Sequence, residues 1–334
     1  MSVFGRILGP DRGTRHDRAA GWFPRYCGHL ARARDAQRYV RAIQNLLARE
    51  MRSLEEKTLL ELGCGFGMTS VALAVLGARA VHGADVHRGM LATQAGVLRD
   101  LEPRLRVYPS ANRAEALGYA SRSFDVVLVV EALSHFLKPE DTLIEVWRVL
   151  KPGGVLILAD DNNGANRRIL RANLEVWERF ENGPPTDNIH GHRVRVSYCE
   201  VRRKIIQAAF PEIGPREAEA LSRETAFKTK TEVLAACREY LTGGSRPNSH
   251  YVHGRCPVEP ETGQFIENAL DPFVLRRQLE QIGFSVEVQA YFGGESRGGL
   301  VYLTNRLLNR LLPLTVTLPI SSGFRMRATK PQAV

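Results

Sequence analysis

The sequence has few cysteines and no long apolar run. Its five cysteines are odd in number and scattered over 334 residues, which argues against a disulfide framework and favours a reducing compartment. No apolar run is long enough to span a bilayer. The basic start, "MSVFGRILGPDRGTRHDR", lacks the apolar core of a signal peptide. We therefore expect a cytoplasmic protein.

Internal repeats, low-complexity tracts and zinc-finger spacings are also missing. The stretch "HYVHGRC" holds His250, His253 and Cys256, and His190 and His192 stand two residues apart. No second cysteine pair lies at finger spacing, so loops are the better interpretation and no metal is expected. The runs "NRRILR" and "VRRKI" are basic, but no RNA-binding module is recognisable and nucleic acid is not the expected partner.

The composition is that of a globular protein with a basic surface. Hydrophobic residues make up 44% of the chain and charged residues 25%, and the formal net charge is +10. A basic surface attracts phosphates on a nucleic acid, an anionic membrane or a nucleotide-like substrate. A solvated basic surface without such a partner is the alternative.

Apolar strands and amphipathic helices alternate from about Thr58 to Asp161. The strands are nearly continuous apolar runs, which is typical of a parallel sheet covered on both faces. A mainly helical stretch follows, and a helix and two strands return near the end. We predict an α/β fold: a Rossmann-like, doubly wound, mostly parallel seven-stranded sheet with a helical insertion after the fifth strand. The expected parts are an N-terminal helical segment (1–54), a core (55–161), a helical insertion (162–270) and a segment that completes the sheet (271–334).

A glycine-rich turn, "ELGCGFG", links the first of these strands to a helix. Glycines accept unusual backbone angles and let a ligand approach where a Cβ would clash. The turn falls at the carboxyl edge of the sheet, where open α/β sheets bind ligands. Its spacing is G-x-G-x-G and not the G-x-G-x-x-G of dinucleotide sites. Glu61, two residues before the first glycine, would repel a pyrophosphate and suit a cation.

Four motifs in order carry a family resemblance: "LLELGCGFGMTSVALA", "GADV", "AEALGYASRSFDVVLVVEALSHF" and "LKPEDTLIEVWRVLKPGGVLIL". Together they resemble the class I S-adenosylmethionine-dependent methyltransferases, in the small-molecule branch with ubiquinone- and sugar-modifying enzymes. The resemblance implies S-adenosylmethionine as cofactor and S-adenosylhomocysteine as product. In this family the glycine turn and its glutamate hold the amino-acid end, the acid after the second strand binds the ribose, and later loops line adenine and the methyl group. The cofactor residues implied here are Glu61, Gly63, Cys64, Gly65, Gly67, Asp85, Val86, Ala114, Glu115, Glu131 and Ala132.

The loop after the fourth strand, "EALSHF", is expected to serve catalysis. Methyl transfer is an in-line displacement, and a hydroxyl nucleophile gains from a base. His135 is the candidate base because its ordinary pKa lies near neutrality, and Glu131 is the second candidate catalytic residue. A histidine that merely packs on the sheet is the alternative. Relatives with a metal in this loop carry a second acid where this chain has Ser134.

The insertion offers polar and aromatic side chains for an acceptor. The candidate substrate residues are His190, His192, Tyr198, His250, Tyr251 and His253. These side chains suit a small-molecule or glycosidic acceptor, methylated at oxygen. An N- or C-methyltransferase of a natural-product or quinone-like acceptor is one alternative, and a cofactor-binding partner protein without activity is another. The sequence does not predict an oligomeric state.

A leucine-rich segment near the end has two faces at helical spacing. One face holds six leucines between Leu300 and Leu312, and the other holds Asn305, Arg306, Asn309 and Arg310. The simpler interpretation is a helix that covers the last strands of the sheet. The alternative is peripheral contact of residues 299–312 with an anionic membrane.

Overall fold

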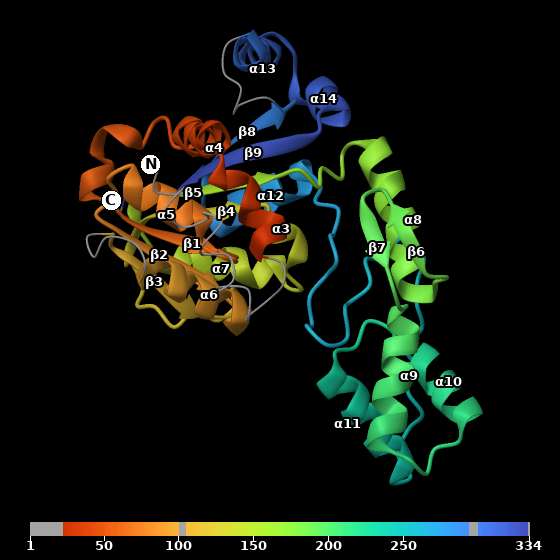
Figure 1. Ribbon diagram of the computed structural model, residues 1–334. Coiled ribbons are helices and arrows are strands. Elements are labelled where there is room, and N and C mark those ends of the chain that lie inside the picture. Colours follow the sequence, from red (N-terminus) through yellow and green to blue (C-terminus); the bar gives the residue numbers. More distant parts are fainter. Residues whose placement is uncertain (1–22, 100–104, 294–299, 333–334) are drawn as a thin grey trace. The chain divides into compact units, whose positions relative to one another are not determined.

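The computed structural model describes residues 23–99, 105–293 and 300–332 (Figure 1). Residues 1–22 of the predicted N-terminal segment and Gly299 of the predicted membrane segment lie outside the described residues. The chain divides into two compact units. Unit 1 comprises the described residues up to Leu133, Lys138–Asp161 and the described residues from Pro272 onward; unit 2 comprises Ser134–Leu137 and Asn162–Asp271.

Unit 1 is built on a seven-stranded sheet with the order β3-β2-β1-β4-β5-β9-β8. Strands β1 to β5 are parallel, and β9 runs antiparallel to both β5 and β8. This order confirms the predicted fold class, and the direction of winding reverses between β1 and β4, where such sheets bind ligands. The strands are β1 (Thr58–Leu62), β2 (Ala80–Asp85), β3 (Val107–Ala111), β4 (Phe124–Val130), β5 (Leu150–Asp160), β8 (Ser285–Tyr291) and β9 (Gly323–Thr329).

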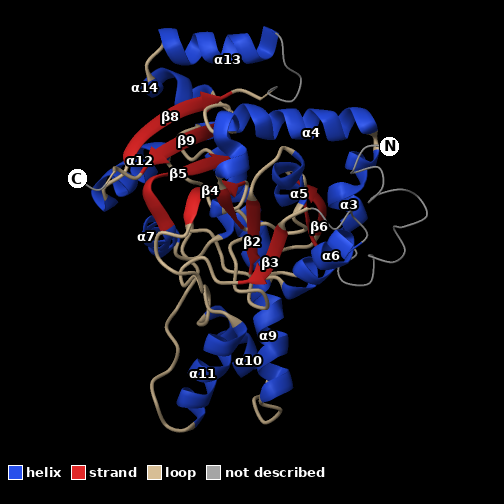
Figure 2. Cartoon of the chain, turned by 90° about the vertical axis from the view of Figure 1, so that its left-hand side faces the viewer, coloured by secondary structure: helices blue, strands red, loops and turns tan. Residues whose placement is uncertain are grey.

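Helices cover the sheet because its central strands are apolar on both faces. Val126, Val127 and Leu128 of β4 are fully buried. Figure 2 shows the helices around the sheet, with α4 packed on α5 and α7 on α12. The helices of unit 1 are α3 (Phe23–Cys27), α4 (Ala33–Leu46), α5 (Met68–Val75), α6 (Arg88–Arg99), α7 (Pro139–Val149), α12 (Pro272–Ile282), α13 (Leu300–Leu311) and α14 (Leu314–Thr317), with short 3₁₀ turns at Gly28–Ala31, Met51–Glu56 and Leu318–Ile320. A further 3₁₀ turn, Leu133–His135, begins in unit 1 and ends in unit 2.

Strand β5 begins earlier than its sequence indicates. The apolar run predicts a strand from Val155, after a break at "KPGG", but β5 already starts at Leu150. Leu150 pairs with Phe124, and the register then shifts before Val126 pairs with Val155. Gly153, at φ 74°, provides the left-handed residue within this irregular stretch.

Unit 2 is mainly helical and has its own apolar core. Ile206, Leu221, Val233 and Cys237 are buried there. Its elements are α8 (Arg167–Asn182), β6 (Thr186–Ile189), β7 (His192–Val194), α9 (Tyr198–Ala209), α10 (Pro215–Arg223) and α11 (Lys230–Leu241). The sequence indicates α8, α9 and α11, whereas α10 and the β6–β7 hairpin escape the pattern because both are short and mostly polar.

Helix α13 covers the sheet edge with its polar face. Asn309 donates to the carbonyl of Ala290 (2.9 Å) and accepts from its amide (2.8 Å), and Asn305 accepts from the amide of Phe292 (3.0 Å). Five of the six leucines on the other face are exposed, and Leu308 is half-buried. The helix therefore lies on the last strands as expected. However, its polar face contacts the sheet, whereas packing on an apolar core would bury the leucine face. No helix among the described residues is long and apolar enough to cross a bilayer.

Candidate functional site

All three glycines of the turn after β1 have left-handed backbone angles. Their φ values are 70° at Gly63, 51° at Gly65 and 73° at Gly67. A Cβ on Gly67 would lie 1.8 Å from Nε2 of Gln94, so this position lets α5 start directly against α6. A Cβ on Gly65 would meet only the sulfur of Met90, at 3.7 Å. The turn is therefore a cradle whose shape depends on glycine conformation.

Asp85, at the end of β2, is bonded to this turn. Its Oδ2 accepts from the amide of Gly65 (2.8 Å), and its Oδ1 accepts from the amide of His87 (2.8 Å) just before α6. The bond to the His87 amide helps to cap the start of α6, whereas the bond to the Gly65 amide has no capping role. Each carboxylate oxygen can accept a further bond. Asp85 thus presents acceptors beside the glycine cradle, while the next residue, Val86, is 45% exposed.

Glu61 is buried beneath the turn. Its carboxylate accepts from the hydroxyl of Ser70 at the start of α5. Burial raises the pKa of Glu61 to about 7, although the hydrogen bonds from Ser70 and Thr69 oppose the rise. Tyr39 of α4 bonds Thr69 through its hydroxyl (2.6 Å). The N-terminal helix therefore supports this acid, a contact that no local sequence pattern indicates.

Phe23 and Gln94 complete the surroundings of the cradle. Phe23 of α3 meets Phe66 of the turn edge to face, with ring centres 5.1 Å apart. Gln94 is fully buried, and its Nε2 has no hydrogen-bond partner in the described part of the chain. Cys64 is also buried and lies 3.7 Å from Oε1 of Gln94. An unpaired buried donor next to Gly67 is what a polar ligand would satisfy.

The predicted adenine segment follows β3. Asn112 donates its amide to the carbonyl of Asp85 (3.1 Å), which places this segment beside the ribose candidate. Arg113 forms an ion pair with Glu115. Ala114 lies inside a small turn closed by the bridge between Arg113 and Ala116. The arginine charge is thus neutralised locally.

Glu131, directly after β4, stands in a strained and charged setting. Its φ is 50°, in the left-handed region that is rare for a residue with a side chain. Its Oε2 accepts from the amide of Asp161 (3.0 Å), and Arg325 of β9 lies 3.9 Å from its Oε1 and 3.5 Å from Asp161. The following Ala132 is buried.

The pKa of Glu131 is raised to about 8. Burial of the carboxyl group is the largest cause, followed by the carboxylates of Asp161 and Asp160, while Arg325 opposes the rise. The side chain keeps 47% of its surface exposed, so the burial that raises this pKa is only partial and the carboxyl group can exchange protons with solvent. Such a carboxyl group holds or accepts a proton near neutral pH. The contribution of Arg325 was missed because it comes from the far end of the sequence.

His135 belongs to unit 2, where one ring nitrogen is fixed. Its Nδ1 lies 3.1 Å from the carbonyl oxygen of Phe265, and its own carbonyl accepts from the amide of Phe265 (3.2 Å). A carbonyl only accepts, so Nδ1 carries the proton in this contact and Nε2 has a lone pair. This tautomer can act as a base.

The candidate acceptor residues do not form one cluster. His190 pairs with Glu175 (2.7 Å) and His253 with Glu178 (3.7 Å), on successive turns of α8. His192 lies 3.5 Å from Glu267, and His250 is exposed.

Tyr198 and Tyr251 are the exceptions among these candidates. Both hydroxyls are buried without a hydrogen-bond partner in the described residues. Burial is the largest cause that raises the pKa of each phenol, and Cys256 and Glu181 contribute in both cases. The two tyrosines therefore share the neighbourhood of Cys256 and Glu181.

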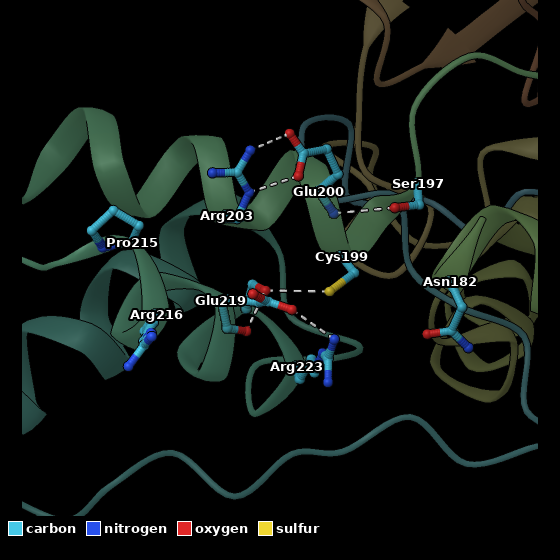
Figure 3. Close-up of a pocket in the computed structure, with 10 residues that line it drawn as sticks. Asn182, Ser197, Cys199, Glu200, Arg203, Pro215, Arg216, Glu219 and Arg223 are labelled. Atoms are coloured by element: carbon cyan, nitrogen blue, oxygen red, sulfur yellow. Dashed lines mark hydrogen bonds and ion pairs between the residues drawn. The ribbon is translucent and has the colours of Figure 1, made fainter. Parts of the chain in front are cut away.

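A cavity of about 640 Å³ lies between α9 and α10 of unit 2 (Figure 3). Arg203 and Arg223 line it, but each is paired within its own helix, with Glu200 and Glu219. Among the described residues, the lining includes none of the six acceptor candidates. This cavity therefore does not support the predicted acceptor site.

The residues of the cradle fit S-adenosylmethionine. A ribose offers hydroxyl donors, which suit Asp85, and an ammonium group suits the carboxylate of Glu61. The amides of Gly63, Gly65 and Gly67 are all bonded within the chain, so a side-chain donor left to a ligand beside the turn is Nε2 of Gln94. Among the described residues no group of three histidines, cysteines or acids is placed to hold a metal.

Comparison with known proteins identifies the core. A family model described as a methyltransferase domain matches residues 60–158. The ubiquinone biosynthesis O-methyltransferase of Parvibaculum lavamentivorans is 34% identical over 115 residues, which cover 34% of this chain and 44% of that protein. The 2-methyl-6-phytyl-1,4-hydroquinone methyltransferase of Synechocystis is 34% identical over 125 residues, 36% of each chain. The matches thus span about half or less of these relatives.

Solved structures show lower identity over more of the chain. A methyltransferase structure from Methanosarcina mazei is 18% identical, with a TM-score of 0.43, and covers 83% of this chain and 93% of its own. Residues 60–158 therefore carry a methyltransferase domain, and this core is similar to S-adenosylmethionine-dependent methyltransferases that act on small molecules.

Proposed function

We propose that this chain transfers a methyl group from S-adenosylmethionine to a hydroxyl oxygen of a small molecule. The single observation that carries the proposal is the bond between Asp85 and the left-handed Gly65, beside the buried Glu61. In this proposal Asp85 is the ribose acceptor and Glu61 is the ammonium acceptor, both at the switch point of the sheet.

The proposed acceptor class is a hydroxylated, quinone-like ring. Two of the similar proteins are named for ubiquinone biosynthesis and for a phytyl hydroquinone, which supports such a ring over a glycoside. A glycosidic acceptor stays the alternative. We also propose that unit 2 selects the acceptor, with Tyr198 and Tyr251 as its best candidates because their hydroxyls are unpaired. A cytoplasmic location is part of the same proposal.

The cofactor, when bound, supplies an electrophilic methyl group on a sulfonium. The residues of this chain would bind and orient the cofactor and remove the acceptor proton. Glu61 and Asp85 would hold the two polar ends of the cofactor, and backbone groups of the cradle would orient it. A base would take the proton of the acceptor hydroxyl as the new bond forms. Both His135, through Nε2, and Glu131, through its raised pKa, are proposed for this step.

Isothermal calorimetry and labelled methyl transfer test the proposal. Asp85→Ala should abolish binding of S-adenosylmethionine, and unchanged affinity would remove the ribose assignment. His135→Gln should keep that affinity and lower turnover of a hydroxylated benzoquinol. Glu131→Gln, at a residue also implied in cofactor binding, should lower turnover at saturating cofactor. Label recovered on carbon or nitrogen would favour the alternative enzyme class, and cofactor binding without transfer to any acceptor pool would favour a binding protein.

A further inference from the structure

Helix α13 carries the least expected surface of unit 1. Four leucines at spacings of three and four residues share its outward face, and they are among the most exposed apolar side chains: Leu300 (80%), Leu303 (59%), Leu307 (56%) and Leu311 (67%). Figures 1 and 2 show α13 beside β8, at the edge of the sheet. A contiguous apolar face of this kind marks a binding surface.

The orientation of α13 is fixed by its asparagines. β8 is the edge strand, and an edge strand leaves backbone groups without a neighbouring strand. Asn309 bonds both the amide and the carbonyl of Ala290, and Asn305 bonds the amide of Phe292 and the carbonyl of Gly293 (2.8 Å). Turning the leucines inward would break all four bonds. The outward apolar face is therefore built into the fold.

The charged residues within the segment that contains α13 are of one sign. Between residues 300 and 320 the sequence has two arginines and no lysine or acidic residue. Arg306 and Arg310 are both exposed and stand one turn apart. The whole chain carries a net charge of +10. An anionic partner is favoured by each of these facts.

The chemistry of the face favours lipid over protein. Leucine is under-represented among residues that dominate protein–protein binding energy. Leucines on one face with arginines beside them are typical of helices that lie in a membrane interface. α13 has 12 residues, or about 18 Å, so it could lie along a bilayer surface and could not cross it.

We propose that α13 docks this protein on an anionic lipid bilayer. Leu300, Leu303, Leu307 and Leu311 enter the boundary of the acyl chains, and Arg306 and Arg310 meet the lipid headgroups. The proposal concerns binding and not methyl transfer, so it stands or falls independently of the proposed function.

Vesicle co-sedimentation of the full chain tests the docking. We use phosphatidylcholine vesicles with and without about one-third phosphatidylglycerol. The protein should bind the anionic vesicles and lose most of that binding in high salt. Leu303→Gln with Leu307→Gln should weaken binding at least about tenfold. Leu241→Gln, at a leucine 41% exposed on α11 of unit 2, is the matched control and should change nothing.

Two further measurements keep the result decisive. Circular dichroism verifies that each variant is folded, and Arg306→Glu with Arg310→Glu provides a second variant with the leucines intact, which should also lose binding. No sedimentation of the full chain would overturn the proposal, as would equal binding to neutral vesicles. A dimer in sedimentation equilibrium that the leucine variant abolishes, without vesicle binding, would assign the face to a second copy instead.

Discussion

At the scale of single residues, Glu131 combines a left-handed backbone with a raised pKa. If its carboxylate takes the acceptor proton, it must be ionised, and with a pKa of about 8 it is mostly protonated at neutral pH. We therefore expect turnover to rise with pH with a midpoint near 8. Because Arg325 lowers this pKa, Arg325→Gln should move the midpoint upward. The measurement is the pH profile of turnover at saturating cofactor.

Glu131→Gln is the control for that profile. The amide cannot ionise in this range, so the variant should lose the rising limb of turnover measured at saturating cofactor. A limb that persists unchanged in the variant would assign the titration to another group.

Gly67 and Gly77 form a matched pair for backbone strain. Both have positive φ, 73° and 101°, but a new Cβ clashes with Gln94 only at Gly67 and meets nothing within 4 Å at Gly77. Gly77→Ala should cost about 1–2 kcal/mol of unfolding free energy from backbone strain. Gly67→Ala should cost about 1–3 kcal/mol more, because overpacking adds to the strain. Urea unfolding measures both, and equal losses would contradict the close contact with Gln94.

At the scale of elements, the asparagines of α13 bond backbone groups at the edge of the sheet that a neighbouring strand would otherwise bond. Asn309→Ala leaves the amide and carbonyl of Ala290 without these partners, and we expect a loss of about 1–3 kcal/mol. Arg310→Ala, one residue away and exposed, should lie within about 0.5 kcal/mol of the parent. Urea unfolding of unit 1 compares the two variants. If both variants unfold alike, the side-chain bonds to β8 do not hold the helix.

Helices and strands were predictable where burial leaves a recognisable pattern of apolar residues in the sequence. Continuous apolar runs such as Val126–Val130 indicated the buried parallel strands, and the glycine turn indicated the cradle. The face of α13 was not predictable, because helical periodicity separates leucines from asparagines without stating which side the protein covers. The same limit applied to Arg325 and Tyr39, whose contacts join distant parts of the sequence.

At the scale of the whole molecule, unit 2 has an internal ion pair of its own. Arg202 of α9 is fully buried, bonds the carboxylate of Glu181 and donates to the carbonyl of Ser222 (2.8 Å). Arg202→Met would leave Glu181 buried without its cation, at a cost of roughly 3–5 kcal/mol. We expect calorimetry to show a destabilised unit 2 with unchanged cofactor affinity. A parallel loss of cofactor affinity would contradict the assignment of the cofactor residues to unit 1.

The arrangement of the central sheet also fixes an order of events during synthesis. Asp160 of β5 pairs with Phe324 of β9, and the whole of Asn162–Asp271 lies between them in the chain. The ribosome must therefore synthesise residues 162–271 before β9 exists and can pair with β5. Contacts of such wide sequence separation form slowly, so β5 waits as a temporary open edge while the insertion is made. A chaperone that shields newly made strands would act in that interval.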